Sequence, residues 1–346
     1  MSLLRIFGLI CAFVSLWLVF LRLRHHSESR FDVAILSAFG VAMLMLSLFP
    51  GLMNLPAELF SLDKHERGRL LTLLILSTVV LWFLVIYERG KTRILSQGFD
   101  RLVRSIAVDK YFENPPHIQD DSILVIIPTY NEESNLCQII PDFPNDISGR
   151  RVIPLIVDDG SLDRTQDICR DFSIPQARNL INRGGGAALR AGFDIAQRLN
   201  ISVIVTMDGD GQHRSEEIAN LVDPIINGEA DLVIGSRLLG EMESYSRLRY
   251  WGVVLFGRMV SLLIGQRITD PASGFRAFAP CVLENCVLIQ DQYHTAELII
   301  ESAKHNLRIT ECPVTIKKRI SGKSKKGKNW KYALLFFRTI VKTWFR

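Results

Sequence analysis

Three long apolar stretches occupy the first part of the chain, roughly Leu3 to Leu21, Phe31 to Leu55 and Leu70 to Tyr87. They contain almost no charge, and each approaches the ~20 residues that a helix needs to cross a bilayer. The pattern predicts three transmembrane helices within residues 1–90. A signal peptide is disfavoured because the first apolar run is too long and no small-residue cleavage site follows it. A buried helical hairpin is disfavoured because little amphipathic periodicity is visible.

Basic residues follow the first apolar stretch at Arg22, Arg24 and Arg30, and follow the third from Arg89 onward. Lys and Arg are enriched in cytoplasmic loops of membrane proteins. We therefore expect an integral protein of the cell membrane whose chain is cytoplasmic after Tyr87. The six cysteines form no CxxC pair and no zinc-binding spacing, which indicates reduced thiols without a metal role.

Residues 91–118 form a junction whose apolar positions recur at helical spacing, at Leu95, Phe99, Leu102, Val103 and Ile106. This spacing predicts a linker helix. An interfacial helix lying on a membrane and a helix packed on the following domain are equally consistent with it. The "NPPH" sequence then interrupts the helix.

From Ser122 onward, short apolar runs alternate with segments of helical periodicity. The predicted strands are "SILVIIPT", "VIPLIVDDGS", "ISVIVTMD" and "DLVIGSR". An alternating order of strands and helices is typical of an α/β domain with a mostly parallel sheet and helices on both faces. We assign this Rossmann-like domain to residues 119–326.

Each predicted strand ends in polar groups, and ligands of such sheets bind at the carboxyl ends of the strands. The third strand ends in "DGDGQ", in which Asp208 and Asp210 are one residue apart. Two such carboxylates can converge on a hard cation such as Mg²⁺, and Gly209 and Gly211 permit close approach of a ligand. Taken alone, the pair is more typical of a loop turn, but four polar strand ends at one edge indicate a site.

The segment "NRGGGAALRAG" is rich in glycine and begins a helix. Backbone N–H groups at such a position can receive phosphate, although a purely structural turn is equally consistent. The segment matches neither the P-loop pattern nor the dinucleotide-binding pattern. An ATPase and a dehydrogenase are therefore disfavoured.

Six motifs occur in order between Ser122 and Lys326: "IPTYNEESNL", "IVDDGSLDRT", "NRGGGAALRAGF", "MDGDGQH", "VIGSR" and "TDPASGFRAF". Together they resemble a family 2 glycosyltransferase of the GT-A fold, in the polyprenyl-phosphate sugar synthase branch that includes dolichol-phosphate mannose synthase. The amino-terminal segment is similar to the DUF2304 membrane domain. The resemblance implies that a single hexose passes from a UDP- or GDP-sugar to a polyprenyl phosphate with inversion, with Mg²⁺ or Mn²⁺ as cofactor.

The resemblance also implies roles for individual residues. The nucleotide sugar would contact Pro128, Tyr130, Glu132, Asp159, Asp208, Gly209, Asp210, Arg237, Arg319 and Lys325. The catalytic residues would be Asp208, Asp210 and Arg237, and the metal ligands Asp210, Gln212 and Asp208. The acceptor phosphate would contact Ser236 and either Arg247 or Arg249. Gly185 stands where the family often has lysine, which puts a phosphate role of the glycine-rich segment in doubt.

Residues 327–346 include the end of a strongly basic stretch, "KKRISGKSKKGKNWK", and the apolar run that follows it, which also carries Arg338, Lys342 and Arg346. This pattern predicts a basic amphipathic helix on the surface of an anionic membrane. Nucleic acid would also attract positive charge, but the apolar amino-terminal segment favours lipid, so we expect no nucleic-acid partner.

Two alternatives remain open from the sequence. The acceptor could be a glycan or glycolipid, although the absence of a QxxRW motif argues against a processive synthase. The chain could also be a non-catalytic membrane scaffold that binds nucleotide sugars. A transporter would need more than three spans unless the chain forms a homo-oligomer, which the sequence leaves open.

Overall fold

A computed structural model describes residues 3–24, 30–53, 66–116, 118, 121–241, 243, 247–290, 294–318 and 329–346. The chain divides into two units, Met1–Ser96 and Gln97–Arg346. The division falls a few residues after the predicted end of the amino-terminal segment at residue 90. Helix α4 (Glu66–Glu113) begins in the first unit and ends in the second.

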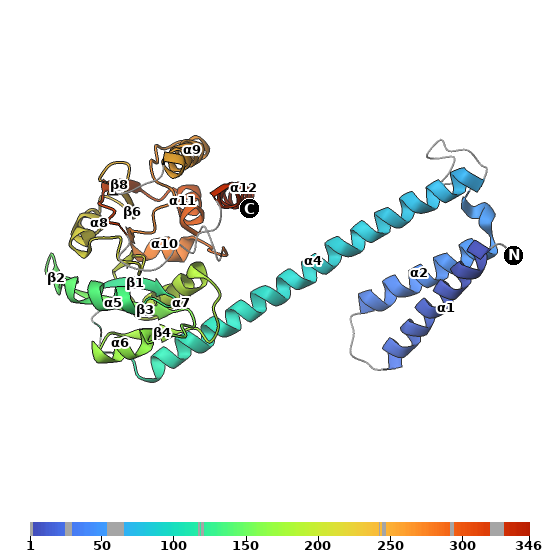
Figure 1. Cartoon of the computed structure of the whole chain (residues 1–346), viewed down its shortest axis with the longest axis horizontal. Coiled ribbons are helices and arrows are strands. Elements are labelled where there is room, and N and C mark those ends of the chain that lie inside the picture. Colours follow the sequence, from blue (N-terminus) through green and yellow to red (C-terminus); the bar gives the residue numbers. More distant parts are fainter. Residues whose placement is uncertain are drawn as a thin grey trace. The chain divides into compact units, whose positions relative to one another are not determined.

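The first unit contains α1 (Leu3–Arg24), α2 (Arg30–Leu48), the short 3-10 helix η1 (Pro50–Met53) and the first part of α4. Helices α1 and α2 lie side by side (Figure 1). Glycine makes this close packing possible, because a Cβ on Gly40 would lie 2.9 Å from Cγ of Leu16. Gly8 likewise packs directly against Ser47. Since Gly8 meets the end of α2 and Leu16 meets its middle, the two helices run antiparallel.

The three predicted transmembrane helices are not supported. Among the residues for which the structure gives a position, no helix is both long and apolar enough to cross a membrane. The predicted integral membrane location therefore has no support from these helices.

The second unit contains all four predicted strands and the helices between them. Its strands are β1 (Ile123–Thr129), β2 (Asp146–Ile147), β3 (Arg150–Asp158), β4 (Gln176–Arg178), β5 (Val203–Thr206), β6 (Leu232–Ser236), β7 (Arg276–Phe278) and β8 (Ile309–Pro313). Its helices after α4 are α5 (Glu133–Ile139), η2 (Ile140–Asp142), α6 (Thr165–Asp171), α7 (Gly185–Arg198), η3 (Ser215–Glu217), α8 (Ile218–Ile226), α9 (Arg247–Ile264), α10 (Pro280–Asn285), α11 (His294–Lys304) and α12 (Asn329–Trp344).

The strands form one sheet in the order β2-β3-β1-β5-β7-β6-β8, with β4 also paired to β3. Strand β1 runs parallel to β3 and β5, and β6 runs parallel to β8. Strand β7 lies between β5 and β6 and is antiparallel to both. The sheet is therefore mixed rather than mostly parallel, because a short strand enters its centre in the opposite direction.

Helices cover both faces of this sheet, as the sequence predicts. Successive side chains of β1 point to opposite faces. Leu124 and Ile126 join the core formed with α7, α11 and the end of α4, whereas Val125 and Ile127 join the core formed with α5 and α8. Strand β1 is therefore buried on both faces, which explains its uninterrupted apolar sequence.

The junction and the carboxyl-terminal segment both form helices. Residues Val103, Ala107, Val108 and Tyr111 of α4 are buried in the second unit. The last turns of α4 are thus packed on the following domain, whereas Leu95, Leu102 and Ile106 are exposed, so an interfacial position of this helix stays a prediction. In α12, Phe336 and Ile340 are buried against α9 and α11, whereas Leu334 and Phe337 are exposed, as is Phe345 directly after the helix. Contact of α12 with lipid stays a prediction.

Candidate active site

The strands that precede most of the predicted site residues end at one edge of the sheet. The register pairs Thr129 with Asp158 and Ile126 with Thr206, which aligns the carboxyl ends of β1, β3 and β5. Strand β6 points in the same direction as β5, because β7 is antiparallel to both. The segments that follow these four strands therefore lie at a common edge, together with the amino end of β7.

Two glycines make room for the acidic pair after β5. A Cβ on Gly209 would lie 2.9 Å from Cγ2 of Thr129, so Gly209 packs directly on the end of β1. A Cβ on Gly274 would lie 2.7 Å from Oδ1 of Asp208. The carboxylate of Asp208 therefore occupies the space that any side chain at position 274 would need.

Asp210 and Gln212 are held by the backbone. Oδ1 of the buried Asp210 accepts a hydrogen bond from the backbone N–H of Gln212 at 3.2 Å. The side-chain Nε2 of Gln212 donates to the carbonyl of Lys317 at 3.1 Å, and the N–H of Lys317 donates back to the carbonyl of Gln212. Because the amide nitrogen is engaged in this way, the amide oxygen is the atom that Gln212 can offer to a ligand.

Asp208, Asp210 and Gln212 fit a divalent cation that is shared with substrate. The described part of the chain contains no group of three or more His, Cys, Asp or Glu residues that could hold a metal by themselves. The candidate set offers two carboxylates and one amide oxygen. Mg²⁺ prefers oxygen ligands and usually completes its shell with water and substrate phosphate, so this incomplete set suits a metal bound together with a diphosphate.

Arg237, predicted to meet phosphate, forms a two-pronged ion pair with Asp270. Its Nε lies 2.6 Å from Oδ2 and its Nη2 lies 2.7 Å from Oδ1 of Asp270. Burial opposes ionisation of Asp270, but the Arg237 guanidinium and its hydrogen bonds hold the pKa of this carboxyl below its ordinary value. A donor phosphate that contacts Arg237 would therefore compete with Asp270 for the guanidinium.

The loop before β7 forms a rigid wall next to this pair. Arg276 is buried and donates to the carbonyls of Ser273, Pro271 and Thr295. Burial lowers the pKa of the Arg276 guanidinium, and the nearby carboxylates of Asp270, Glu311 and Asp208 oppose this shift. Ser236, predicted to contact the acceptor phosphate, is buried with its hydroxyl 2.5 Å from that of Thr269.

Sequence reasoning assigned no role to Asp270 or Arg276. The motif "TDPASGFRAF" contains both residues, and the presence of an acid and an arginine in one short apolar motif was the available signal. Glu311 was also missed. Its carboxylate accepts hydrogen bonds from the backbone N–H groups of Thr269 and Asp270 and so fixes the start of this loop.

Asp159 joins the end of β3 to the glycine-rich segment. Its Oδ1 accepts from Nδ2 of Asn179 at 2.8 Å, and its Oδ2 accepts from the N–H groups of Arg183 and Gly184 at 3.0 and 2.6 Å. Burial raises the pKa of Asp159, and these hydrogen bonds oppose the rise. Gly160 has a left-handed φ of 78°, and a Cβ there would lie 3.0 Å from the backbone nitrogen of Asn182.

The turn after β1 is tied to the turn after β3. The N–H of Asn131 donates to the Ser161 hydroxyl, and the N–H of Leu162 donates to the Asn131 side chain. The predicted pocket residues Tyr130 and Glu132 lie in this turn, Pro128 lies in the last part of β1, and all three are half-buried. The Glu132 carboxylate accepts a hydrogen bond from Nδ2 of Asn135 at 2.5 Å. These three residues therefore border the same edge as Asp159.

Several predicted contacts fall on parts of the chain that cannot be placed. Arg319 and Lys325 lie outside the described residues. Arg247 and Arg249 begin α9, but their side chains also lie outside the described set. The roles of these four residues stay predictions. Gly185 begins α7, and a Cβ there would meet no other atom within 4 Å.

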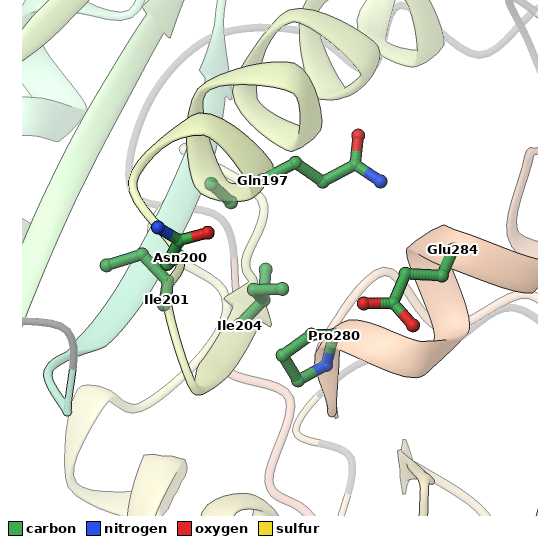
Figure 2. Close-up of a pocket in the computed structure, with 7 residues that line it drawn as sticks. Gln197, Asn200, Ile201, Ile204, Pro280 and Glu284 are labelled. Carbon is green, nitrogen blue, oxygen red and sulfur yellow. The ribbon is translucent and has the colours of Figure 1, made fainter.

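A cavity of about 430 Å³ lies away from this edge (Figure 2). It is lined by Ala196, Gln197, Asn200, Ile201, Ile204, Pro280 and Glu284. Ile201 precedes β5, and Pro280 follows β7, which is antiparallel to β5. The cavity is therefore at the amino end of β5, opposite the acidic pair, and we do not assign the chemistry to it.

This chain matches a family model and is similar to several known proteins. The family model "Glycosyl transferase family 2" matches residues 124–285. Polyprenol monophosphomannose synthase of Mycolicibacterium smegmatis is 33% identical over 228 residues, covering 61% of this chain and 83% of that protein. UDP-N-acetylglucosamine–dolichyl-phosphate N-acetylglucosaminyltransferase of Methanococcus voltae is 31% identical over 217 residues, covering 56% of this chain and 85% of that protein.

Solved structures show the same fold. Glucosyl-3-phosphoglycerate synthase from Mycobacterium tuberculosis, in complex with Mn²⁺, UDP-glucose and phosphoglyceric acid, matches with a TM-score of 0.50 at 16% identity. The match covers 67% of this chain and 86% of that one. A mycobacterial protein of known structure matches with a TM-score of 0.54 at 16% identity, covering 66% of this chain and 80% of that one.

The second unit thus has the GT-A fold with a mixed sheet. The family match begins at residue 124, after the amino-terminal segment, whose similarity to the DUF2304 domain stays a prediction. The matches to the two relatives extend over most of each relative's own length. One relative is named a monophosphomannose synthase and the other an N-acetylglucosaminyltransferase. The chain therefore belongs to glycosyltransferase family 2 and is a glycosyltransferase.

Proposed function

We propose that this glycosyltransferase transfers a single hexose from a UDP- or GDP-sugar to a polyprenyl phosphate, with inversion at the anomeric carbon. The observation that carries the proposal is the acidic pair Asp208 and Asp210, which lies next to glycines at the carboxyl end of β5. Strands β3 and β6 end at the same edge, and Asp159 and Arg237 follow them directly. An edge of this composition suits a sugar diphosphate as donor.

The names of the relatives support the acceptor. Besides the two enzymes above, the similar proteins include a dolichol-phosphate mannosyltransferase of Pyrococcus furiosus and an undecaprenyl-phosphate mannosyltransferase of Micrococcus luteus. Both are named for transfer to a polyprenyl phosphate. Because the names of all four relatives differ in the lipid, and in the sugar between mannose and N-acetylglucosamine, they favour the class of acceptor and leave the donor sugar to experiment.

The reaction needs no strong general base. A phosphate oxygen of the acceptor attacks the anomeric carbon, the bond from that carbon to the diphosphate oxygen breaks, and its electron pair leaves with the nucleoside diphosphate. The acceptor phosphate is already anionic at neutral pH, so the protein has to position the reactants and stabilise leaving-group charge. The segment after β3, with Asp159, and the turn after β1 would hold the nucleotide.

Asp208, Asp210 and the amide oxygen of Gln212 would hold Mg²⁺ or Mn²⁺ against the donor diphosphate. A cation bound there would neutralise charge on the departing nucleoside diphosphate. The structure supports this assignment through the glycine space beside Asp208 and the engaged amide nitrogen of Gln212.

A lipid acceptor places the reaction at a membrane surface, and we propose the cytoplasmic face, where the nucleotide sugar would be available. On α9, Trp251, Leu255 and Leu262 are exposed and share one helix face with Arg258, while Val253 and Val260 pack into the core. An exposed apolar stripe with a basic residue suits the boundary between water and lipid.

The test incubates the full-length protein with Mg²⁺ or Mn²⁺, undecaprenyl or dolichyl phosphate, and each common radiolabelled UDP- or GDP-sugar in turn. We expect label from one donor to enter the organic phase in an acid-labile product. Asp210→Asn should abolish the transfer, whereas Asp167→Asn, an exposed carboxylate on α6, should leave it unchanged. Transfer only to a water-soluble or glycolipid acceptor would contradict the proposal.

A further inference from the structure

Asp100, near the end of α4, gathers arginines from the glycine-rich segment. Its Oδ1 lies 3.0 Å from Nη2 of Arg190 and 3.4 Å from Nη2 of Arg183. The guanidinium of Arg183 also lies over the ring of Phe99, 5.5 Å from its centroid. All these side chains belong to the second unit.

These contacts are partly shielded from solvent. The Asp100 side chain is 16% exposed and that of Arg190 is 5% exposed. Arg190 also donates to the carbonyl of Gln290 at 2.9 Å, so it connects α4, α7 and the loop before α11. Charge-assisted hydrogen bonds in such surroundings hold geometry better than fully exposed ion pairs.

The same segment is held from its other side by Asp159. The backbone N–H groups of Arg183 and Gly184 donate to the Asp159 carboxylate, while the side chain of Arg183 reaches Asp100. Residues 183 and 184 are therefore fixed between the end of β3 and α4. The family match begins at residue 124, so Asp100 lies outside it.

We propose that Asp100 is a positioning residue for the donor site. Its carboxylate holds Arg183 and Arg190 so that the segment Asn182–Gly184 stays against Asp159 in the geometry that binds the nucleotide. This inference rests on the proposed function only in assigning the Asp159 edge to the nucleotide.

The chain offers a matched control for this role. Asp109 lies on the same helix and pairs with Arg198, which lies on the same α7 as Arg190, with an Nη1–Oδ1 distance of 2.9 Å. This second pair joins the same two helices but at the opposite end of α7 from the glycine-rich segment. We expect loss of either pair to weaken the docking of α4, but only loss of Asp100 to remove a partner of Arg183.

The experiment measures binding of UDP and of GDP to the full-length protein by calorimetry, and the KM and kcat for the donor sugar that the enzyme uses. For Asp100→Asn we expect the nucleotide dissociation constant and the donor KM to rise about ten-fold, as expected for loss of one hydrogen bond to a charged group. The kcat should stay within about two-fold, because the lost interaction acts on binding rather than on the transition state alone.

Asp100→Glu should restore most of the affinity, and Asp109→Asn should leave both binding and KM unchanged. If Asp100→Asn folds poorly, Phe99→Leu is a second test. It removes the ring beneath Arg183 and should also raise the nucleotide dissociation constant. The inference is overturned if Asp100→Asn binds nucleotide as the wild type does, or if Asp109→Asn weakens binding equally.

Failure of the inference and failure of the proposed function have different signatures. Lipid product formed with the same donor KM in Asp100→Asn and wild type would reject the positioning role and keep the proposed function. Weakened nucleotide binding in Asp100→Asn, with no lipid product from any donor in the wild type, would keep the positioning role and reject the lipid acceptor.

Discussion

Arg237 and Asp270 face each other with two parallel contacts, 2.6 and 2.7 Å, at the inner wall of the active-site edge. They are 33 residues apart in the chain and lie after β6 and before β7. Asp270 is fully buried, so its charge depends for compensation on Arg237, on the backbone N–H of Arg237 and on the nearby Arg276. The pair therefore has a structural role, and a phosphate that contacts Arg237 would have to bind while this ion pair is kept or weakened.

Asp270→Asn should destabilise the protein by about 3–5 kcal/mol at pH 7, because it removes the two-pronged ion pair of the largely buried Arg237 guanidinium. Urea unfolding followed by circular dichroism measures the loss. Asp231→Asn, which removes the partner of the exposed Arg308, is the control and should cost much less. Equal losses in the two variants would contradict the distinction.

The same substitution should change the response to acid. The folded-state pKa of Asp270 lies below the ordinary value of an aspartate, so its ionised form contributes stability above about pH 4. That contribution is lost as the pH falls through the lowered pKa. The stability difference between wild type and Asp270→Asn should therefore shrink between pH 5 and pH 2. A difference independent of pH over this range would show that Asp270 does not titrate there.

Gly274→Ala should impair catalysis while leaving the fold intact. Its Cβ would fall 2.7 Å from Oδ1 of Asp208, so the carboxylate must move. A displacement of about 1 Å in a catalytic group can cost about a hundred-fold in rate, and we expect kcat to fall at least ten-fold. Gly252→Ala on α9, where a Cβ meets nothing within 4 Å, is the control and should keep its activity. Full activity of Gly274→Ala would refute the placement of Asp208.

Asp159→Asn should loosen the glycine-rich segment. Both carboxylate oxygens accept hydrogen bonds, from Asn179 on one side and from Arg183 and Gly184 on the other. An asparagine must turn its NH₂ group toward one of these donors, which leaves a buried donor unsatisfied at a cost of about 1–3 kcal/mol. Calorimetry with UDP or GDP should show weaker binding at pH 7. Unchanged affinity would remove Asp159 from the donor site.

Gly160→Ala and Gly185→Ala should affect stability differently, although both glycines lie next to Asn182–Gly184 of the glycine-rich segment. Gly160 has a φ of 78°, and alanine there costs about 1–2 kcal/mol from backbone strain alone. The contact of its Cβ with Asn182 adds to that cost. Gly185 begins a helix in open space, so alanine should be neutral or slightly stabilising. Thermal unfolding of the two variants measures the difference.

Much of the second unit could be predicted from sequence because its strands are buried on both faces. Residues of β1 and β3 form apolar runs long enough to recognise, and the polar residues that follow them mark the site edge. Strand β7 has only three residues, so no periodicity identifies it. The mixed sheet could not be predicted for that reason.

The partners of charged residues were the least predictable part of the site. Arg237 was expected to meet phosphate, yet its guanidinium holds Asp270, which the sequence shows only as one acid in a turn. Asp100 and Arg183 are 83 residues apart, and no local pattern connects them. The prediction of transmembrane helices before residue 90 rests on the length and composition of the apolar stretches. These two properties do not separate a membrane span from other apolar helices.

The place of β7 also determines the order in which the protein can be completed on the ribosome. Strands β1, β3, β4 and β5 emerge first and can pair with one another at once. Strand β6 is synthesised next but cannot join them until β7 has been made, because β7 lies between β5 and β6. We therefore expect the part of the sheet formed by β1, β3, β4 and β5, which borders the proposed nucleotide site, to form early in synthesis. The loop with Asp270 and the strand with Arg276 would complete the site last.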